Sequence, residues 1–386
     1  MSSYRLKPKY IFGKDAMEQA SIELKKYNFK KAVILYGKGS IKTNGIYNDV
    51  VNALNNAKIE HVEFEGIEPN PRDTTIYKAS LFCRENDIDL ILAVGGGSVI
   101  DASKVIGILA NNPVYEDTWS YVLNQSKVTK PCIPIVAVIT LAGTASENNA
   151  GSVVTNEITR EKTGVFTPTG IPFLCVENPK YTFSVNPWQT ASGIFDCFSH
   201  LLEQYFGKAT FEWTKEYIFA NLKTLLKYAK TCILKPDHYI ARANVLWTTS
   251  MSLNSTASFL SDSDWSVHSI EHGFSGLWDI THGAGLALIT PVYLDIRSKK
   301  EKWFEDKLIE LGRNVFKTNT REETIKFIRD FIDGINLPSK WTQFKEIKSF
   351  TDDNVEFLVK HTVSFSDRPE LKELYREVIE TIKNNI

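Results

Sequence analysis

The first half of the chain alternates short apolar runs with amphipathic stretches. Four β-rich runs have the length of strands and lie at residues 31–37, 61–67, 90–97 and 134–140. Three stretches between them carry apolar residues at helical spacing, namely residues 47–58, 74–87 and 98–110. Strands that alternate with helices predict a parallel, doubly wound sheet of the α/β class.

The pattern changes near the segment YTFSVNPWQTASG at residues 181–193. Asn186 followed by Pro187 has the form of a helix N-cap with proline at the first helical position. Beyond it, helical periodicity dominates, as at residues 191–206, 214–230, 321–335 and 354–365. We therefore predict an α/β domain over residues 1–184 and an all-helical domain over residues 185–386.

Composition excludes several classes of protein. The 386 residues carry a net charge of -1, so the chain lacks the basic field that binding a nucleic-acid backbone requires. The opening MSSYRLKPKYIF lacks the basic-then-apolar layout of a signal peptide, and no apolar run is long enough to span a bilayer. Five scattered cysteines without a CxxC pair favour a reducing, cytoplasmic location.

The segment VGGGSVID at residues 94–101 joins a buried strand to the start of a helix. Backbone N–H groups at such a turn can bind a phosphate, although glycines also serve a tight connection without any ligand. The segment is neither a Walker A loop nor a complete G-x-G-x-x-G motif. Asp101 follows Ser98 by three residues, so it either points back to the same turn or is a first-turn helix charge.

A second glycine turn, YGKGSIK at residues 36–42, follows the first predicted strand. A carboxylate at this place would bind a ribose 2′-hydroxyl and select NAD. Here Gly39 and Ser40 are small and Lys38 and Lys42 flank them, which favours a 2′-phosphate and so NADP(H) over NAD(H). The alternative is a solvated lysine turn.

Three of the seven histidines lie within residues 267–287. His268 and His272 are four residues apart and share a helix face, and a loop after residue 278 can return His282 to them. Asp196 and His200 share a face in the same way, in a helix that is otherwise apolar. The pair alone would suit a buried Asp–His hydrogen bond, but two converging helices favour a divalent cation.

Four ligands, Asp196, His200, His268 and His282, complete such a site, which suits Fe²⁺ or Zn²⁺. His272 then remains near the cation without binding it. An imidazole with a pKa near neutrality is a candidate proton carrier in that position.

The motifs GGGSVID, TLAGTASE, GIFDCFSH and VHSIEH…THGAGLA, in this order, resemble those of the iron-containing, or group III, alcohol dehydrogenases. The segments EGIEPNPR and YGKGSIK are similar to the branch of butanol dehydrogenases and NADPH-dependent aldehyde reductases. Lys38 departs from the NADP-using members, which have a small residue there. The resemblance covers nearly the whole chain.

The resemblance implies a Rossmann-like dinucleotide-binding domain and a helical metal-binding domain, with the active site in the cleft between them. It implies that Gly96, Gly97 and Ser98 hold the pyrophosphate, and that His272 lies near the nicotinamide. The other cofactor-binding residues that we expect are Gly39, Ser40, Asn70, Asp101, Thr140, Thr144, Ser146 and Lys162. The catalytic candidates are His272 and Asp101, and a homodimer is expected from the family.

We therefore expect hydride transfer between a nicotinamide and a short-chain primary alcohol or aldehyde. Trp119, Trp265 and Trp278 could wall a small apolar pocket, although large aromatics more often belong to a core. The alternatives are a polyol or glycerol-type dehydrogenase on the same scaffold, a metal-dependent hydrolase, and a binding protein without catalysis. The hydrolase would not need the glycine turn, and the sequence has no HExxH base.

Overall fold

The computed structural model describes residues 8–385 and divides them into two compact units. The α/β unit runs to Val185 and includes Pro236–Leu246, and the helical unit holds Asn186–Lys235 and the chain from Trp247 onward. Residues 1–7, which belong to the segment assessed for a signal peptide, lie outside the described residues, as does Ile386.

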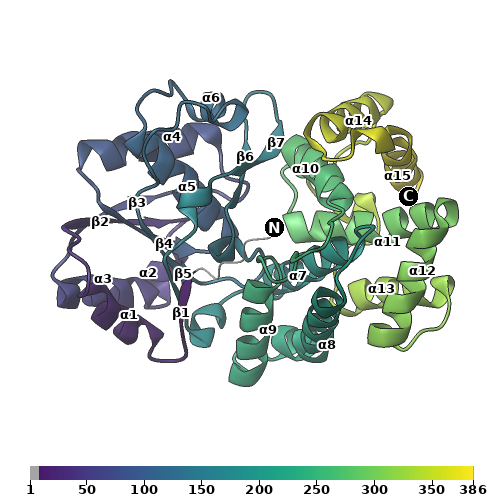
Figure 1. Ribbon diagram of the computed structural model, residues 1–386, viewed down its shortest axis with the longest axis horizontal. Coiled ribbons are helices and arrows are strands. Elements are labelled where there is room, and N and C mark those ends of the chain that lie inside the picture. The colour runs from purple at the N-terminus through teal and green to yellow at the C-terminus, as the bar shows by residue number, and fades with distance from the viewer. Residues whose placement is uncertain (1–7, 386) are drawn as a thin grey trace. The chain divides into compact units, whose positions relative to one another are not determined.

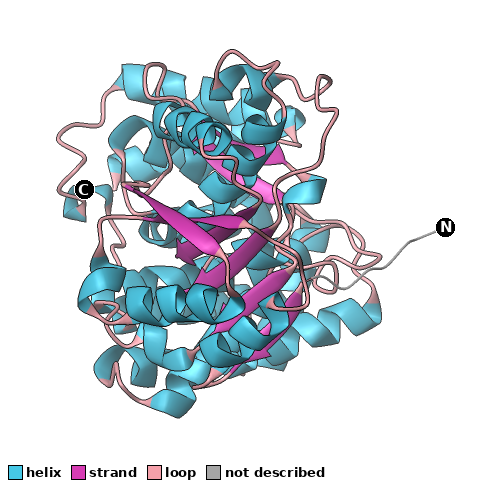
Figure 2. Cartoon of the chain, turned by 90° about the vertical axis from the view of Figure 1, so that its left-hand side faces the viewer, coloured by secondary structure: helices cyan, strands magenta, loops and turns pink. Residues whose placement is uncertain are grey.

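A six-stranded parallel sheet forms the centre of the α/β unit, in the order β1-β8-β5-β4-β2-β3 (Figure 2). Its strands are β1 (Lys9–Phe12), β2 (Lys31–Tyr36), β3 (Glu60–Glu65), β4 (Leu90–Gly95), β5 (Ile135–Ile139) and β8 (Leu174–Glu177). An antiparallel hairpin, β6 (Gly151–Thr155) and β7 (Lys162–Phe166), stands apart from it. The predicted parallel sheet is confirmed, and β2 to β5 fall within the four predicted runs or within one residue of them.

Helices cover both faces of this sheet (Figure 1). The helices of the unit are α1 (Ala16–Leu24), α2 (Ser40–Thr43), α3 (Ile46–Ala57), α4 (Asp73–Glu85), α5 (Gly97–Asn111) and α6 (Thr118–Leu123). Alternation along β2 explains the two layers, because Ile34 and Tyr36 pack with α1 and α3 whereas Val33 and Leu35 pack with α4 and α5. Each layer has its own apolar core.

The chain reverses its direction of winding between the neighbouring strands β2 and β4. Strand β2 leads through α3 on one face to β3, and β4 leads through α5 on the other face to β5. Open α/β sheets bind ligands outside the carboxyl ends of their strands at such a switch point. Both glycine turns singled out in the sequence flank it, since residues 37–40 follow β2 and residues 96–98 follow β4.

The helical unit consists of long helices that pack against one another. Its first helix begins as predicted: Pro187 is the first helical residue, and the Asn186 side chain accepts a hydrogen bond from the Gln189 N–H. Its helices are α7 (Pro187–Tyr205), α8 (Glu212–Leu234), the end of α9 (Tyr239–Met251), α10 (Ser266–Trp278), α11 (His282–Lys300), α12 (Lys302–Leu311), α13 (Arg321–Gly334), α14 (Asp352–Phe365) and α15 (Lys372–Asn384). Helices α7, α10 and α11 meet at the centre of the site described below.

All five cysteines are buried and form no disulfide: Cys83, Cys132, Cys175, Cys197 and Cys232.

Between residues 8 and 385, no helix has both the length and the apolar composition that crossing a membrane would require.

Candidate active site

Helix α7 brings a carboxylate and an imidazole to one buried face. Asp196 and His200 are one turn apart, and both side chains are almost completely buried. The Nε2 atom of His200 lies 3.5 Å from Oδ1 of Asp196. This oxygen is the centre of the cluster.

Two further imidazoles reach the same oxygen from α10 and α11. The Nε2 atoms of His268 and His282 each lie 3.6 Å from Oδ1 of Asp196. Asp279 ends α10 in the left-handed conformation, and α11 starts at His282, so the short turn between the helices returns the chain to the cluster. The structure thus brings together the four residues predicted from the sequence as metal ligands.

Close packing of α11 on α7 sets the position of His282. A Cβ atom on Gly283 would lie only 2.0 Å from the carbonyl oxygen of Ser192, one turn before Asp196 on α7. Only a residue without a side chain permits this approach. The glycine in the THGAGLA segment therefore lets the first residue of α11 lie beside Asp196.

The spacing of these atoms fits a small cation. In a regular tetrahedron the edge is about 1.63 times the distance from centre to corner, so bonds of about 2.0–2.2 Å to oxygen and nitrogen imply edges of about 3.3–3.6 Å. The three distances from Asp196 Oδ1 fall in this range. Ligand atoms of Asp196, His268 and His282 also lie within 4.8 Å of one another, whereas His200 is close to Asp196 but stands outside this group. Within residues 8–385, Oδ1 of Asp196 and Nε2 of His268 are buried without a hydrogen-bond partner, as expected of atoms that bind an ion.

The electrostatics of the cluster keep Asp196 ionised. Burial acts to raise the pKa of the Asp196 carboxyl, but the imidazoles around it hold this pKa below its usual range. Burial lowers the pKa of His200 to about 3, so this imidazole is neutral and can offer a nitrogen lone pair. Burial also acts against a charge on His268, yet Glu203 and Asp196 together outweigh burial and raise the pKa of His268 to about 10.

Glu203, which the sequence analysis did not single out, supports His268 from behind. One oxygen of this buried carboxylate is hydrogen-bonded to Nδ1 of His268 and accepts from Ser199 Oγ at 3.0 Å. The other accepts from the backbone N–H groups of Val267 and His268 at 2.9 and 3.1 Å. Glu203 therefore caps the start of α10 and orients the ring of His268 at the same time.

Glu271 orients the ring of His282 in the same way, and the sequence analysis did not single out this residue either. Its Oε2 atom is hydrogen-bonded to Nδ1 of His282, and its Oε1 atom accepts from Ser275 Oγ. Gly285 leaves room for this carboxylate, because a Cβ atom there would lie 2.8 Å from Oε1. The available signal was spacing, because Glu203 follows His200 and Glu271 follows His268 by three residues, which places each glutamate near the helix face of a predicted ligand.

His272 lies beside the cluster. Its ring centre is 6.2 Å from that of His268 and 5.6 Å from that of His282. A nitrogen of His272 lies within 4.8 Å of ligand atoms of Glu271 and His282, whereas Asp196 is grouped in this way with His268 and His282. The proton-carrier role of His272 stays a prediction.

Of the three tryptophans considered in the sequence, Trp265 borders the cluster. Its ring centre lies 5.4 Å from that of His268 and 6.1 Å from that of His200, edge to face in both cases. Trp278 packs instead against Phe274 and Phe350. Trp119 packs against the apolar core of the α/β unit.

The glycine turn at residues 96–98 of the α/β unit lets neighbouring groups approach its backbone closely. Gly96 precedes the 15-residue helix α5, so the first N–H groups of that helix are directed at the carboxyl end of the sheet. A Cβ atom on Gly97 would lie 2.3 Å from the Thr144 side chain. The backbone N–H of Thr140 donates to Gly95 at 3.0 Å. The residues predicted around the pyrophosphate are therefore neighbours.

Asp101 fastens this helix to the segment that follows β5. Its Oδ1 atom accepts from Ser146 Oγ, and its Oδ2 atom accepts from the Val153 N–H at 2.9 Å. The fully buried Lys104 donates to Ser146 Oγ at 3.0 Å and to the Gly151 carbonyl. Both oxygens of Asp101 thus have structural partners, and its catalytic role stays a prediction.

Two other predicted cofactor residues touch each other although 92 positions separate them. The Lys162 ammonium donates to Oδ1 of Asn70 at 2.9 Å, and both side chains are buried. Lys162 comes from β7, and Asn70 has a positive φ of 51° in the loop before α4. The pairing places both side chains at one end of the hairpin.

The second glycine turn differs from expectation at one lysine. Gly39, with φ of 84°, caps the short helix α2 that Ser40 begins. Lys38 is exposed, but the Lys42 ammonium lies 3.2 Å from a Glu63 carboxylate oxygen and 3.9 Å from one of Glu65. Lys42 therefore does not offer the uncommitted ammonium group on which the NADP(H) expectation partly rests.

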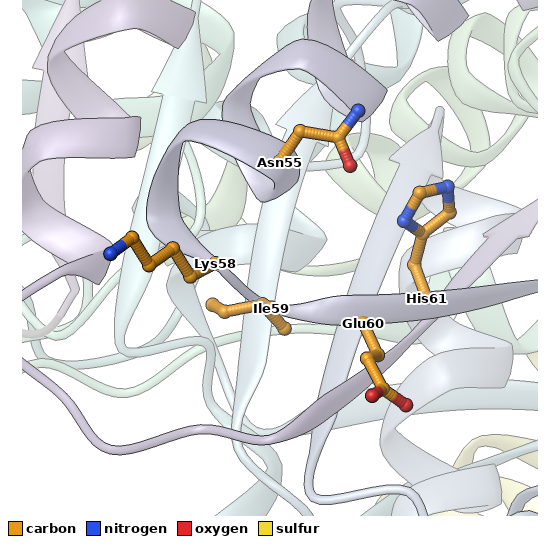
Figure 3. Close-up of a pocket in the computed structure, with 5 residues that line it drawn as sticks. All are labelled: Asn55, Lys58, Ile59, Glu60 and His61. Carbon is orange, nitrogen blue, oxygen red and sulfur yellow. The ribbon is translucent and has the colours of Figure 1, made fainter.

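A shallow hollow elsewhere on the α/β unit lacks comparable chemistry (Figure 3). It lies where α3 ends and β3 begins, at the amino end of the strand, and is lined by Asn55, Lys58, Ile59, Glu60 and His61. Figure 3 shows the side chains of Lys58, Glu60 and His61 pointing in different directions. Ligands of such sheets bind at the carboxyl ends, so we do not assign function to this hollow.

Comparison with known proteins matches almost the whole chain to one family in two parts. Residues 7–179 match the family model described as iron-containing alcohol dehydrogenase. Residues 190–383 match the model for the C-terminal part of the Fe-containing alcohol dehydrogenase family.

Individual relatives are similar over most of their length. NADH-dependent butanol dehydrogenase A of Clostridium acetobutylicum is 38% identical, over 93% of this chain and 92% of the relative. The NADPH-dependent aldehyde reductase YqhD of Escherichia coli is 30% identical over 86% of each chain. The crystal structure of NADH-dependent butanol dehydrogenase A from Thermotoga maritima has a TM-score of 0.91 at 28% identity, covering 100% of this chain and 99% of that one.

Proposed function

The chain belongs to the iron-containing alcohol dehydrogenase family, and on this premise we propose that it interconverts short-chain primary alcohols and aldehydes by hydride transfer with a nicotinamide dinucleotide. One observation carries the proposal. Three imidazole nitrogens lie 3.5–3.6 Å from a single buried carboxylate oxygen, at the spacing of ligands around one divalent cation.

We propose Asp196, His200, His268 and His282 as the ligands of Fe²⁺ or Zn²⁺, since one carboxylate and three imidazoles suit both ions. When bound, such a cation supplies a Lewis acid that lowers the pKa of an alcohol hydroxyl and polarises an aldehyde carbonyl. Glu203 and Glu271 hold two of the imidazoles in the orientation that binding needs, through Nδ1 of His268 and Nδ1 of His282.

His272 is proposed as the proton carrier of the reaction. It borders the ligand cluster, with its ring centre 5.6 Å from that of His282. During alcohol oxidation its imidazole accepts the hydroxyl proton and passes it to solvent, and during aldehyde reduction it returns a proton. Trp265 packs edge to face against His200 and His268, and its ring is proposed to limit the size of the substrate.

The α/β unit is proposed to bind the dinucleotide, which supplies or accepts the hydride. The turn at Gly96, Gly97 and Ser98 would receive the pyrophosphate at the start of α5, supported by Thr144 against Gly97. Asn70 and Lys162, which are hydrogen-bonded to each other, are proposed to contact the same cofactor.

The choice of dinucleotide is not decided by the family, because the butanol dehydrogenase relative is named NADH-dependent and the aldehyde reductase NADPH-dependent. The preference for NADP(H) expected from the sequence stays a prediction. It depends on the small residues Gly39 and Ser40 and on Lys38, since Lys42 is paired with Glu63. We also propose a cytoplasmic homodimer, for which light scattering of the purified protein is the direct test.

A nicotinamide absorbance assay tests the proposal. Purified protein is mixed with butanal and NADH or NADPH, and in the reverse direction with butanol and the oxidised cofactor, each with and without a chelator. We expect turnover that the chelator removes and that added Fe²⁺ or Zn²⁺ restores. Hydrolysis of an ester in place of a cofactor-dependent absorbance change would favour a metal-dependent hydrolase, and glycerol outpacing butanol would favour the polyol branch.

Asp196→Ala is the variant that tests the proposed ligand set. It should lose both the bound metal and the activity, because the removed oxygen lies within 3.6 Å of all three ligand nitrogens. Asp237→Ala, which removes an exposed carboxylate from the loop before α9, is the control and should keep both. Metal analysis that finds a wild-type amount of metal in Asp196→Ala would rule out this ligand set.

A further inference from the structure

A cluster of charged and aromatic side chains stands at the carboxyl ends of β2 and β3, beside the turn at residues 37–40. Tyr36 is the last residue of β2 and pairs in register with Glu65, the last residue of β3. Glu63 and Glu65 point to the same face of the sheet as Tyr36, because side chains alternate along each strand. This is the face that α2 and α3 cover.

Four groups surround the ammonium of Lys42 on α2, whose side chain is 42% exposed. Its ammonium lies 3.2 Å from Glu63 and 3.9 Å from Glu65, and 5.3 Å from the ring centres of both Tyr36 and Tyr47. The Tyr36 hydroxyl donates to the same two carboxylates, at 2.7 Å to Glu63 and 3.2 Å to Glu65. The lysine ammonium thus lies between two carboxylates and two aromatic rings and already has partners.

The position of this cluster matters because of the switch point between β2 and β4. A dinucleotide with its pyrophosphate at the turn after β4 extends its adenosine ribose to the turn after the neighbouring strand, here β2. Gly39 and Ser40 form that turn, and Lys42 follows two residues later. A 2′-phosphate on the ribose would meet two carboxylates and a lysine that one of them already neutralises.

We infer that Glu63 and Glu65 are specificity-determining residues that select NADH over NADPH, by holding Lys42 and by placing negative charge beside the 2′ position of the ribose. This inference rests on the proposed function and reverses the cofactor preference expected from the sequence. The carboxylates act by repulsion of the unwanted phosphate, which is how many sites obtain specificity without new contacts to the preferred ligand.

The test measures kcat/KM for NADH and for NADPH in butanal reduction, and the dissociation constant of each reduced cofactor from its fluorescence. The wild-type protein should prefer NADH. Glu63→Gln together with Glu65→Gln should raise the NADPH-to-NADH ratio by about tenfold, because the released ammonium can pair with the phosphate. Lys42→Met added to this double variant should abolish the gain, whereas Lys42→Met alone should change the ratio less than about twofold.

Glu60→Gln is the matched control, because it removes the same charge from the exposed amino end of the same strand and should leave the ratio unchanged. A wild-type preference for NADPH, an unchanged ratio in the double variant, or a gain that persists without Lys42 would each overturn the inference. If the wild-type protein shows no turnover with either cofactor, the proposed function would be contradicted. The fluorescence titration would still report which dinucleotide binds.

Discussion

At the scale of single residues, the imidazoles of the cluster divide into the three proposed to hold the ion and His272 beside them. His272→Ala should keep the bound metal at the wild-type amount, because the three nitrogens that lie 3.5–3.6 Å from Asp196 Oδ1 belong to His200, His268 and His282. Its kcat for butanol oxidation near neutral pH should fall by about 100-fold, since proton transfer by a positioned side chain contributes on this order. His61→Ala, an imidazole removed from β3, is the control. Unchanged turnover across neutral pH would remove His272 from the mechanism.

Glu203 provides a second residue-scale prediction, because one carboxylate serves both the backbone of α10 and the ring of His268. Glu203→Gln keeps the size of the side chain but removes the charge that orients Nδ1. The affinity for the metal should fall by about 10- to 100-fold, as measured by competition with a chromogenic chelator. Glu377→Gln, at an exposed ion pair with Lys300, should leave the affinity unchanged. Equal affinities in the two variants would show that Glu203 is only a helix cap.

At the scale of elements, Gly283 sets how closely α11 approaches α7. It therefore also sets the distance between His282 and Asp196. Gly283→Ala places a Cβ atom 2.0 Å from the Ser192 carbonyl oxygen, so α11 must move away from α7 and take His282 with it. We expect a loss of stability of roughly 1–3 kcal/mol, a lower Tm and weaker metal binding. Gly334→Ala, at the end of α13 where a Cβ meets nothing within 4 Å, is the control. Similar melting curves for both variants would contradict this role of Gly283.

Elements also explain what the sequence alone could predict. Strands β2, β4 and β5 are buried apolar runs, and β3 is a more exposed β-rich run, so the local pattern predicted all four. The i, i+4 spacing of Asp196 with His200 and of His268 with His272 pointed to the cluster. Strands β1 and β8 are only four residues long and pair with each other across 165 positions of register, which no local pattern reveals. Glu203 and Glu271 were missed for the same reason, because their roles depend on atoms that the folded helices bring together. Lys42 was assigned to a phosphate because its partners Glu63 and Glu65 lie on another strand.

At the scale of the whole molecule, the buried charges of the helical unit link metal binding to stability. Asp196, Glu203 and Glu271 are three carboxylates buried around one cluster, and the proposed divalent cation would compensate for the cost of their burial. Removal of the metal by a chelator should therefore lower Tm. A ligand present at about 1,000 times its dissociation constant stabilises the folded state by about 4 kcal/mol, which sets the size of the effect.

The pH dependence of metal loss follows from the chemistry of the ligands. An imidazole binds a metal only in its neutral form. The pKa of His268 is raised to about 10 by Glu203 and Asp196, so protons compete with the ion for this ligand. Release to a fixed concentration of chelator should be faster at pH 6 than at pH 8, and added Fe²⁺ or Zn²⁺ should restore the original Tm. Asp196→Ala provides the reference, because its Tm should not respond to chelator or to metal at either pH. A wild-type Tm that is equally indifferent would mean that the four proposed ligands hold no ion, and the proposed alcohol dehydrogenase chemistry would then lack its Lewis acid.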